Sequence, residues 1–155
     1  MSSPILFAPS ADLSVAICGI WWLVTREDWT KDGKKRIDPT LGADPVGILS
    51  YSGTHFAAQF MKRDRSENGG EQLFYSGQNN TSAVGGYDAY FGTYEADEQT
   101  GKVAHTLIGS ITPANIGIMV SRDMRVSDDK LIIQLETTRP DGEPITRTLT
   151  WKRLS

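Results

Sequence analysis

Short stretches in which apolar and polar residues alternate recur along most of this chain, and turn-forming residues separate them. From Ile20 to Asp28, Trp21 and Leu23 alternate with Trp22 and Val24, which is the two-residue period of a β-strand with two different faces. The pattern predicts eight strands, at residues 20–28, 46–51, 55–61, 91–96, 103–111, 117–126, 131–138 and 145–153.

The connections between these strands carry turn chemistry and are mostly short. Ser52-Gly53 separates the second strand from the third, and Pro140-Asp141-Gly142 separates the last two. Because crossover helices do not fit into such connections, neighbouring strands must pair antiparallel. Eight strands in succession can close a barrel, which removes unpaired sheet edges and can hold one small molecule. The predicted fold class is therefore all-β, an eight-stranded up-and-down antiparallel barrel.

Three segments interrupt the strand pattern. Ser10 and Asp12 can cap a short helix at about residues 11–18, and Gly19 can adopt the positive φ that ends it, which predicts a plug before the first strand. Residues 31–45 are expected to form a long polar loop over the barrel mouth. Residues 62–78 form the longest insertion, between the third and fourth strands, and residues 83–89 are predicted to form one or two helical turns after it.

Composition favours one globular domain, spanning residues 1–155, with the barrel at about residues 19–153. The chain is 39% hydrophobic and 23% charged, which suits a stable core. Its formal charge of −3 provides no broad basic surface, so we expect no nucleic-acid partner. With a single cysteine, Cys18, and two histidines there is no disulfide and no cluster with metal-ligand spacing, so we expect no metal. Without a nucleotide loop either, we expect no cofactor.

The apolar run at residues 13–24 is the one segment worth testing as a membrane span. Its roughly 12 residues are fewer than the ~20 that a spanning helix needs. No basic residue precedes the run, as a secretory signal would require. We therefore expect a cytoplasmic protein with no membrane partner.

Strand parity predicts polar side chains inside the barrel. Because side chains alternate across a strand, the more apolar set should face the interior and carry residues of the same parity with it. This rule places Arg147 inside with Ile145, Leu149 and Trp151, Arg122 inside with Val120 and Met124, and His105 inside with Val103, Leu107 and Ile111.

An ionised guanidinium inside a barrel needs partners, because burying it unpaired costs several kcal/mol. In one interpretation the partners belong to the protein, or Arg147 stacks over Trp21 and closes the barrel floor. In the other, at least one arginine is left for a carboxylate, phenolate or enolate oxygen of a bound organic molecule. The candidate internal partners are Glu27, Glu95, Tyr51, Tyr90 and Tyr94.

His105 also allows two interpretations. A lone histidine on an apolar strand face is commonly a hydrogen-bonded core residue, yet its pKa near neutrality suits a general acid or base. Parity does not settle whether Gln59 and Met61 or their neighbours Phe56 and Phe60 look inward. The residues expected to line the cavity are Trp21, Leu23, Tyr51, Gln59, Met61, Tyr94, Leu107, Val120, Met124, Arg147 and Trp151.

Several short segments, in this order, resemble the lipocalin-like domain proteins of bacteria and fungi, within the wider group of calycin barrels. They include Gly19-Ile20-Trp21-Trp22-Leu23-Val24, Ala58-Gln59-Phe60-Met61, Tyr87-Asp88-Ala89-Tyr90, Val103-Ala104-His105 and Leu149-Thr150-Trp151. The resemblance runs from about Gly19 to Arg153 and implies an eight-stranded barrel with a cavity. His105, Arg122, Tyr90 and Gln59 match recurring polar positions of the family, which makes them the first residues to test.

Two functions follow from these observations. The first is binding of a small hydrophobic, oxygen-bearing molecule, with Arg122 or Arg147 holding its polar end. The second, which the resemblance also suggests, is a cofactor-independent cyclase, isomerase or dehydratase of secondary metabolism, acting on a polyketide- or terpenoid-like intermediate. There His105 or Tyr90 moves a proton while Arg122 stabilises an oxyanion. A packed barrel that serves as an interaction module is a third interpretation, and a second copy of the chain is a candidate partner.

Overall fold

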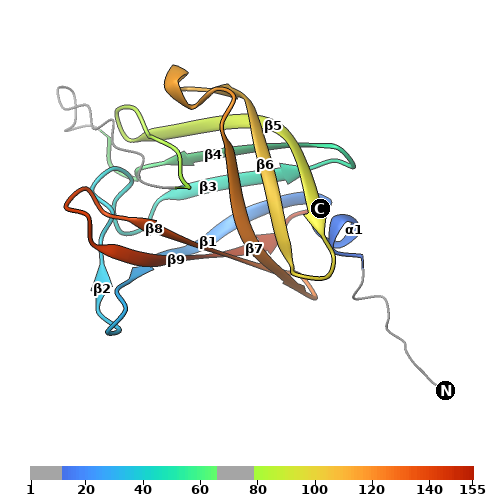
Figure 1. The fold of residues 1–155 in the computed structure, drawn as a ribbon, viewed down its shortest axis with the longest axis horizontal. Helices are drawn as coiled ribbons and strands as arrows, with labels where there is room; N and C mark the ends of the chain where they lie inside the picture. Colours follow the sequence, from blue (N-terminus) through green and yellow to red (C-terminus); the bar gives the residue numbers. More distant parts are fainter. Residues whose placement is uncertain (1–11, 66–78) are drawn as a thin grey trace.

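Eight antiparallel strands close into a barrel in the computed structural model, which describes residues 12–65 and 79–155 (Figure 1). Each strand pairs with the next, and the first pairs with the last, which confirms the predicted fold class. A short additional strand, β2 (Lys35–Arg36), pairs with the end of the first strand. The barrel strands are β1 (Gly19–Trp29), β3 (Val46–Tyr51), β4 (His55–Met61), β5 (Tyr87–Asp97), β6 (Lys102–Ser110), β7 (Met119–Ser127), β8 (Lys130–Thr138) and β9 (Pro144–Arg153).

The predicted helical turns at residues 83–89 are wrong. Gly85 and Gly86 both have positive φ, at 57° and 80°, and a right-handed helix cannot continue through such residues. The chain instead turns there and enters β5 at Tyr87, four residues before the predicted start at Phe91. Of the polar insertion predicted at residues 62–78, positions 66–78 lie outside the described residues.

One end of the barrel is closed by the helix α1 (Leu13–Ala16), as the predicted plug requires (Figure 1). The side chains of Leu13 and Ile17 are buried in the core. Asp12 makes no capping hydrogen bond with its side chain; the carboxylate of Glu98 accepts from the backbone N–H groups of Leu13 and Ser14, at 2.5 and 3.1 Å. A residue distant in sequence therefore caps this helix.

The parity prediction is confirmed for the three polar residues of the later strands. Arg122, Arg147 and His105 are all buried, together with most of the apolar neighbours that predicted their direction. Ile111 is an exception: it lies one residue beyond β6, where alternation no longer applies, and it is 39% exposed.

In β1 the parity prediction is wrong beyond Leu23. The register with β9 shifts between Leu23 and Thr25, so Val24 and Thr25 are both exposed. Such a bulge reverses the alternation that follows it. Asp28 therefore points inward, whereas Glu27 lies outside and pairs with Lys35 at 3.1 Å.

In β4 the large aromatic side chains occupy the interior. Phe56 and Phe60 are buried, so Gln59 is exposed and Met61, half-buried, also lies on the outer face. The prediction that Gln59 and Met61 line the interior is therefore wrong. The reason is that one strand offers one face to the core, and burial of two phenylalanine rings removes far more apolar surface from water than burial of an amide and a thioether.

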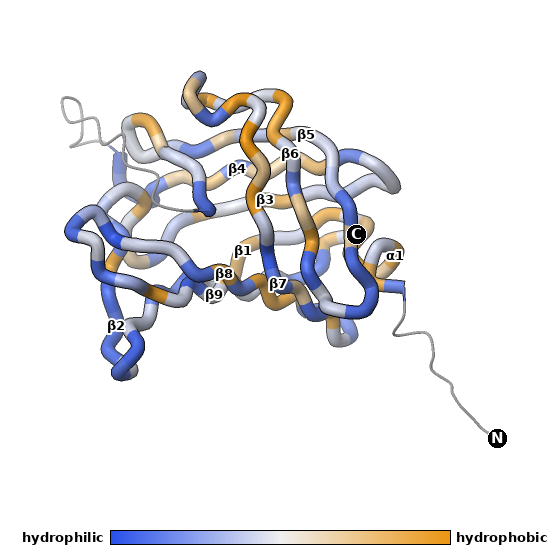
Figure 2. The backbone as a smooth tube through the Cα atoms, in the orientation of Figure 1, coloured by the Kyte–Doolittle hydropathy of each residue, from blue (hydrophilic) through white to orange (hydrophobic). Residues whose placement is uncertain are grey.

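Apolar residues also lie on the outer surface, around the 3-10 helix η2 (Pro113–Asn115) between β6 and β7. Ile108, Ile116 and Met119 are each more than half exposed. Figure 2 shows this region as a hydrophobic stretch where the end of β6 and the start of β7 meet. In the described part of the chain, no helix is long and apolar enough to cross a membrane.

Candidate functional site

Two small cavities inside the barrel share part of their lining. The outer cavity, of about 60 Å³, lies at the end of the barrel formed by residues 38–41, 80–83 and 138–140. The inner cavity, of about 30 Å³, lies deeper, between residues such as Tyr51 and His105. The residues that line both are Phe60, Tyr90, Arg122 and Leu149. The interior is therefore mostly packed, with space left around Arg122 and Tyr90.

The predicted lining residues divide into three groups. Tyr51, Val120, Met124 and Trp151 line the inner cavity and Arg147 lines the outer one. Gln59 and Met61 lie on the outside, where Gln59 accepts a hydrogen bond from the hydroxyl of Tyr87. The residues that are buried in the packed core and line neither of the two cavities are Trp21, Leu23, Tyr94 and Leu107.

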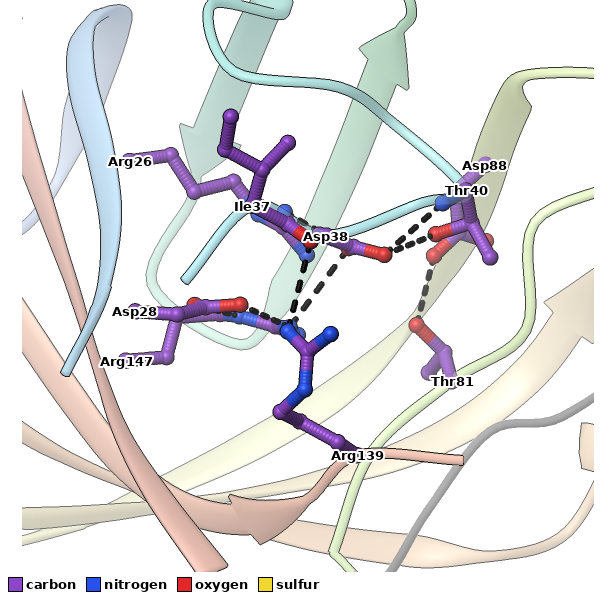
Figure 3. Close-up of polar contacts among 9 residues, drawn as sticks. All are labelled: Arg26, Asp28, Ile37, Asp38, Thr40, Thr81, Asp88, Arg139 and Arg147. Carbon is purple, nitrogen blue, oxygen red and sulfur yellow. Dashed lines mark hydrogen bonds and ion pairs between the residues drawn. The ribbon is translucent and has the colours of Figure 1, made fainter. Parts of the chain in front are cut away.

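Arg147 is satisfied within the protein. Its Nε and Nη2 donate to the two carboxylate oxygens of Asp28 at 2.7 and 2.9 Å, which is the paired geometry that a guanidinium prefers (Figure 3). Stacking of Arg147 over Trp21 does not occur; Arg153 takes that place, 4.2 Å from the ring centroid. The bulge in β1 supplies the partner, because it turns Asp28 inward.

Asp38, from the loop after β2, ties this loop to the barrel wall. Its Oδ2 accepts from Arg26 at 2.8 Å and lies 3.5 Å from Arg147, while its Oδ1 accepts from the backbone and hydroxyl of Thr40 (Figure 3). Burial opposes ionisation of Asp38, but the two guanidinium groups and the Thr40 bonds hold its pKa well below the usual range. The outer cavity thus carries a saturated ion-pair cluster on one side.

Arg122 lies on the other side of this cavity and has no such partner. It is 7% exposed, and its Nη1 donates to the backbone oxygens of Asn79 and Ser121 at 2.8 and 3.0 Å. Like Tyr90, it lines both cavities. Among residues 12–65 and 79–155, no carboxylate forms an ion pair with it. Its positive charge is therefore uncompensated by any described neighbour.

Asp88 is the polar residue of this site that sequence reasoning missed. Thr81 donates to its Oδ2 at 2.5 Å, and both residues line the outer cavity. Asp88 and Thr81 therefore share this cavity with Tyr90 and Arg122. The missed signal was parity: Asp88 stands two residues before Tyr90, but the predicted strand began too late to include either.

The second oxygen of Asp88 is unusual. Its Oδ1 is buried and has no hydrogen-bond partner among the described residues. Burial raises the pKa of Asp88 to about 6, against the lowering effects of Thr81 and Arg26. The carboxylate is therefore ionised at neutral pH, with one oxygen free to accept a hydrogen bond.

The inner cavity contains a neutral histidine. The hydroxyl of Tyr51 lies 2.6 Å from Nε2 of His105. Burial, together with the nearby charge of Arg122, lowers the pKa of His105 to about 3, so the ring carries no charge at neutral pH. Its Nδ1 and the Nε1 of Trp151 are buried without a hydrogen-bond partner in the described residues. His105 therefore cannot act as an imidazolium acid under ordinary conditions.

Comparison with known proteins identifies one family. The model of the family described as lipocalin-like domain matches residues 18–154, which confirms the resemblance seen in the sequence. None of the curated proteins matches the chain. The described residues contain no group of three or more His, Cys, Asp or Glu side chains that could hold a metal ion.

Proposed function

Because this chain belongs to the lipocalin-like domain family, we propose that its barrel binds a small, oxygen-bearing organic molecule in the two cavities. Arg122 holds the oxygen in this proposal. The apolar part of the molecule lies against Phe60 and Leu149, which line both cavities.

The observation that carries the proposal is the buried charge of Arg122, which no carboxylate of the described residues compensates. Replacing water around a guanidinium by a largely apolar interior costs several kcal/mol unless an anion or a full set of acceptors is supplied. Arg147, in the same barrel, has such an anion in Asp28. The contrast between the two arginines supports a role for Arg122 toward a bound oxygen.

The volumes favour a short ligand. Pockets for drug-sized molecules usually measure 300–1,000 Å³, and an engineered cavity of about 150 Å³ is enough for benzene. With about 60 and 30 Å³, the outer and inner cavities suit a carboxylate or carbonyl group with a few carbon atoms. A longer hydrophobic tail has to lie at the barrel mouth.

Replacing Arg122 tests this proposal. Arg122→Gln removes the charge and leaves a shorter polar side chain. We expect it to weaken the binding of butyrate at least tenfold, since hydrogen bonds to charged groups contribute about 1.5–3 kcal/mol. The dissociation constant is measured by titration of the amide NMR spectrum. Arg125→Gln, an exposed arginine on the same strand, is the matched control and should leave affinity unchanged. Equal affinity in Arg122→Gln excludes Arg122 as the anchor.

A second candidate function is a cofactor-independent isomerase, cyclase or dehydratase that acts on a polyketide- or terpenoid-like intermediate. It is favoured by the presence of Asp88 and Arg122 in the lining of one cavity. A carboxylate with a pKa of about 6 can accept a proton while the guanidinium stabilises an enolate oxygen. Because a pKa of about 3 makes His105 a weak base and leaves no imidazolium at neutral pH, Asp88 replaces it in this mechanism.

Exchange of the C2 protons of acetoacetate in D₂O tests this second function. Asp88 takes a proton from C2, the electron pair moves onto the ketone oxygen beside Arg122, and a deuteron returns to C2. We expect the protein to accelerate the exchange and Arg122→Ala to abolish the acceleration. An exchange rate in the presence of the protein that equals the rate in buffer removes this candidate.

A further inference from the structure

The free oxygen of Asp88 marks a second contact point in the outer cavity. Asp88 is 5% exposed and lines the same cavity as Arg122, and its Oδ1 lacks a hydrogen-bond partner among the described residues. Leaving a buried carboxylate oxygen unpaired is expensive, so native proteins keep few such groups. The oxygen is thus available to a hydrogen-bond donor that enters this cavity.

The neighbouring cations do not provide that donor. Arg26 is bound to Asp38, and Arg147 is bound to Asp28, as Figure 3 shows. In the same view Asp88 is joined to Thr81 through its other oxygen. Among the described residues of this lining, the ion pairs leave Asp88 Oδ1 without a hydrogen-bond donor and Arg122 without a carboxylate. The Nε of Arg139 also lacks a hydrogen bond, but it faces the carboxylate of Glu143 at 3.6 Å.

The charge of the outer cavity indicates what kind of molecule satisfies both groups. Among the residues that the structure describes, its lining holds four guanidinium groups, of Arg26, Arg122, Arg139 and Arg147, and three carboxylates, of Asp28, Asp38 and Asp88. The lining thus has one more positive than negative charge. The nearby carboxylate of Glu143 does not cancel this excess, because it forms ion pairs with both Arg139 and Arg36, and Arg36 adds a further positive charge. One positive charge remains, which favours a monoanion over a cation. The donor to Asp88 is then a neutral group, such as a hydroxyl.

The spacing of the two groups sets the distance between the ligand's own polar atoms. Asp88 and Tyr90 are successive inward positions on β5, roughly 7 Å apart along the strand. Tyr90 lines both cavities together with Arg122, so we place the anion site about one such step from Asp88. A hydroxyl and a carboxylate separated by two or three carbon atoms can reach both.

We infer that Asp88 is a specificity-determining residue of this site, whose free oxygen accepts a hydrogen bond from a ligand hydroxyl while Arg122 binds the ligand's carboxylate. The ligand class is then short hydroxycarboxylic acids. This inference rests on the proposed function, since it requires the anion to lie at Arg122.

The test compares 3-hydroxybutyrate with butyrate at pH 7.5, by titration of the amide NMR spectrum. The two acids differ by one hydroxyl. We expect the unaltered protein to bind 3-hydroxybutyrate about tenfold or more tightly than butyrate, as a hydrogen bond to a charged group allows. In Asp88→Ala the two affinities become equal within about threefold, because the acceptor is gone.

Three controls make the result decisive. Asp123→Ala, an exposed carboxylate on β7, should keep the preference for the hydroxy acid. Asp88→Asn, which retains an oxygen acceptor of the same size, should keep a reduced preference even if Asp88→Ala does not fold. Arg122→Gln should weaken the binding of both acids by the same factor.

Two results would overturn the inference and leave the proposed function standing: equal binding of the two acids by the unaltered protein, or an unchanged preference in both Asp88 variants. Failure of the unaltered protein to bind either acid, or unchanged binding of both in Arg122→Gln, would overturn the proposed function as well. The two failures are therefore distinguishable within one set of titrations.

Discussion

At the scale of single residues, the barrel interior contains two kinds of buried charge. Asp28, Asp38, Arg26 and Arg147 neutralise one another at distances between 2.7 and 3.5 Å. Among the described residues, the side chain of Asp88 accepts a hydrogen bond from the neutral hydroxyl of Thr81. Removing one partner of a buried ion pair destabilises the folded protein strongly, because the other charge is left unpaired. A charge that is already buried without an ionic partner lowers the free energy of unfolding.

This difference predicts opposite effects of pH in two matched variants. The pKa of Asp88 is raised from 3.8 to about 6, so its favourable contribution, complete below about pH 4, is lost as the pH rises through 6. At pH 8 Asp88→Asn should therefore be more stable than the unaltered protein, by up to about 3 kcal/mol at ~1.4 kcal/mol per pKa unit, and the advantage should vanish near pH 4.

Asp38→Asn should behave in the opposite way. The pKa of Asp38 is lowered, so its contribution is present above about pH 4 and is lost as the pH falls further. This variant should be less stable at pH 8, by a margin that shrinks in acid. Urea unfolding at pH 2.5, 4, 6 and 8 measures both, and a loss of stability at pH 8 in Asp88→Asn contradicts the account of Asp88 as a carboxylate whose burial costs stability.

At the scale of elements, irregularities in two strands decide where side chains point. The bulge at Leu23 and Thr25 turns Asp28 into the barrel, and β5 has a second register shift between Phe91 and Gly92. At Gly92 the neighbouring strand comes so close that a Cβ atom would stand 1.8 Å from the backbone oxygen of Thr106. Glycine is needed there because no other residue leaves room for β6.

Gly92→Ala should consequently destabilise the barrel by at least about 2 kcal/mol, since backbone rather than a flexible side chain must move. Gly53→Ala is the control: nothing lies within 4 Å of its Cβ position, and its φ is not positive, so stability should stay within about 0.5 kcal/mol. The midpoint of urea unfolding gives both values. A midpoint for Gly92→Ala equal to that of the unaltered protein would show that the two strands separate easily at this point.

At the scale of the whole molecule, β1 links the two halves of the barrel. It pairs with β3 through Gly19–Trp22 and with β9 through Trp21–Trp29, so a single strand closes the ring. The end of the chain completes the closure, because Leu154 donates to the backbone oxygen of Ile20 at 2.7 Å and Ile20 donates to Ser155 at 3.0 Å. Closure brings Arg147 of β9 beside Asp28 of β1, which are distant in sequence.

The sequence by itself determined the fold class, the order of the strands and the burial of Arg122, Arg147 and His105. These properties follow from local information: a period of two residues, turn residues between strands, and the rule that one face of each strand is apolar. The bounds of β3 and β4 were predicted to the residue for the same reason.

Only the tertiary structure decided which charged side chains form ion pairs and how large the cavities between them are. Glu27 was a candidate partner for the arginines, but one extra residue in the bulge put Asp28 in its place. The inward position of Asp88 was not predicted, because it depends on β5 beginning at Tyr87, as the structure shows. Ion pairs and cavities depend on distances between strands far apart in the chain, and a shift of one residue reverses a side chain's direction, so no local pattern contains them.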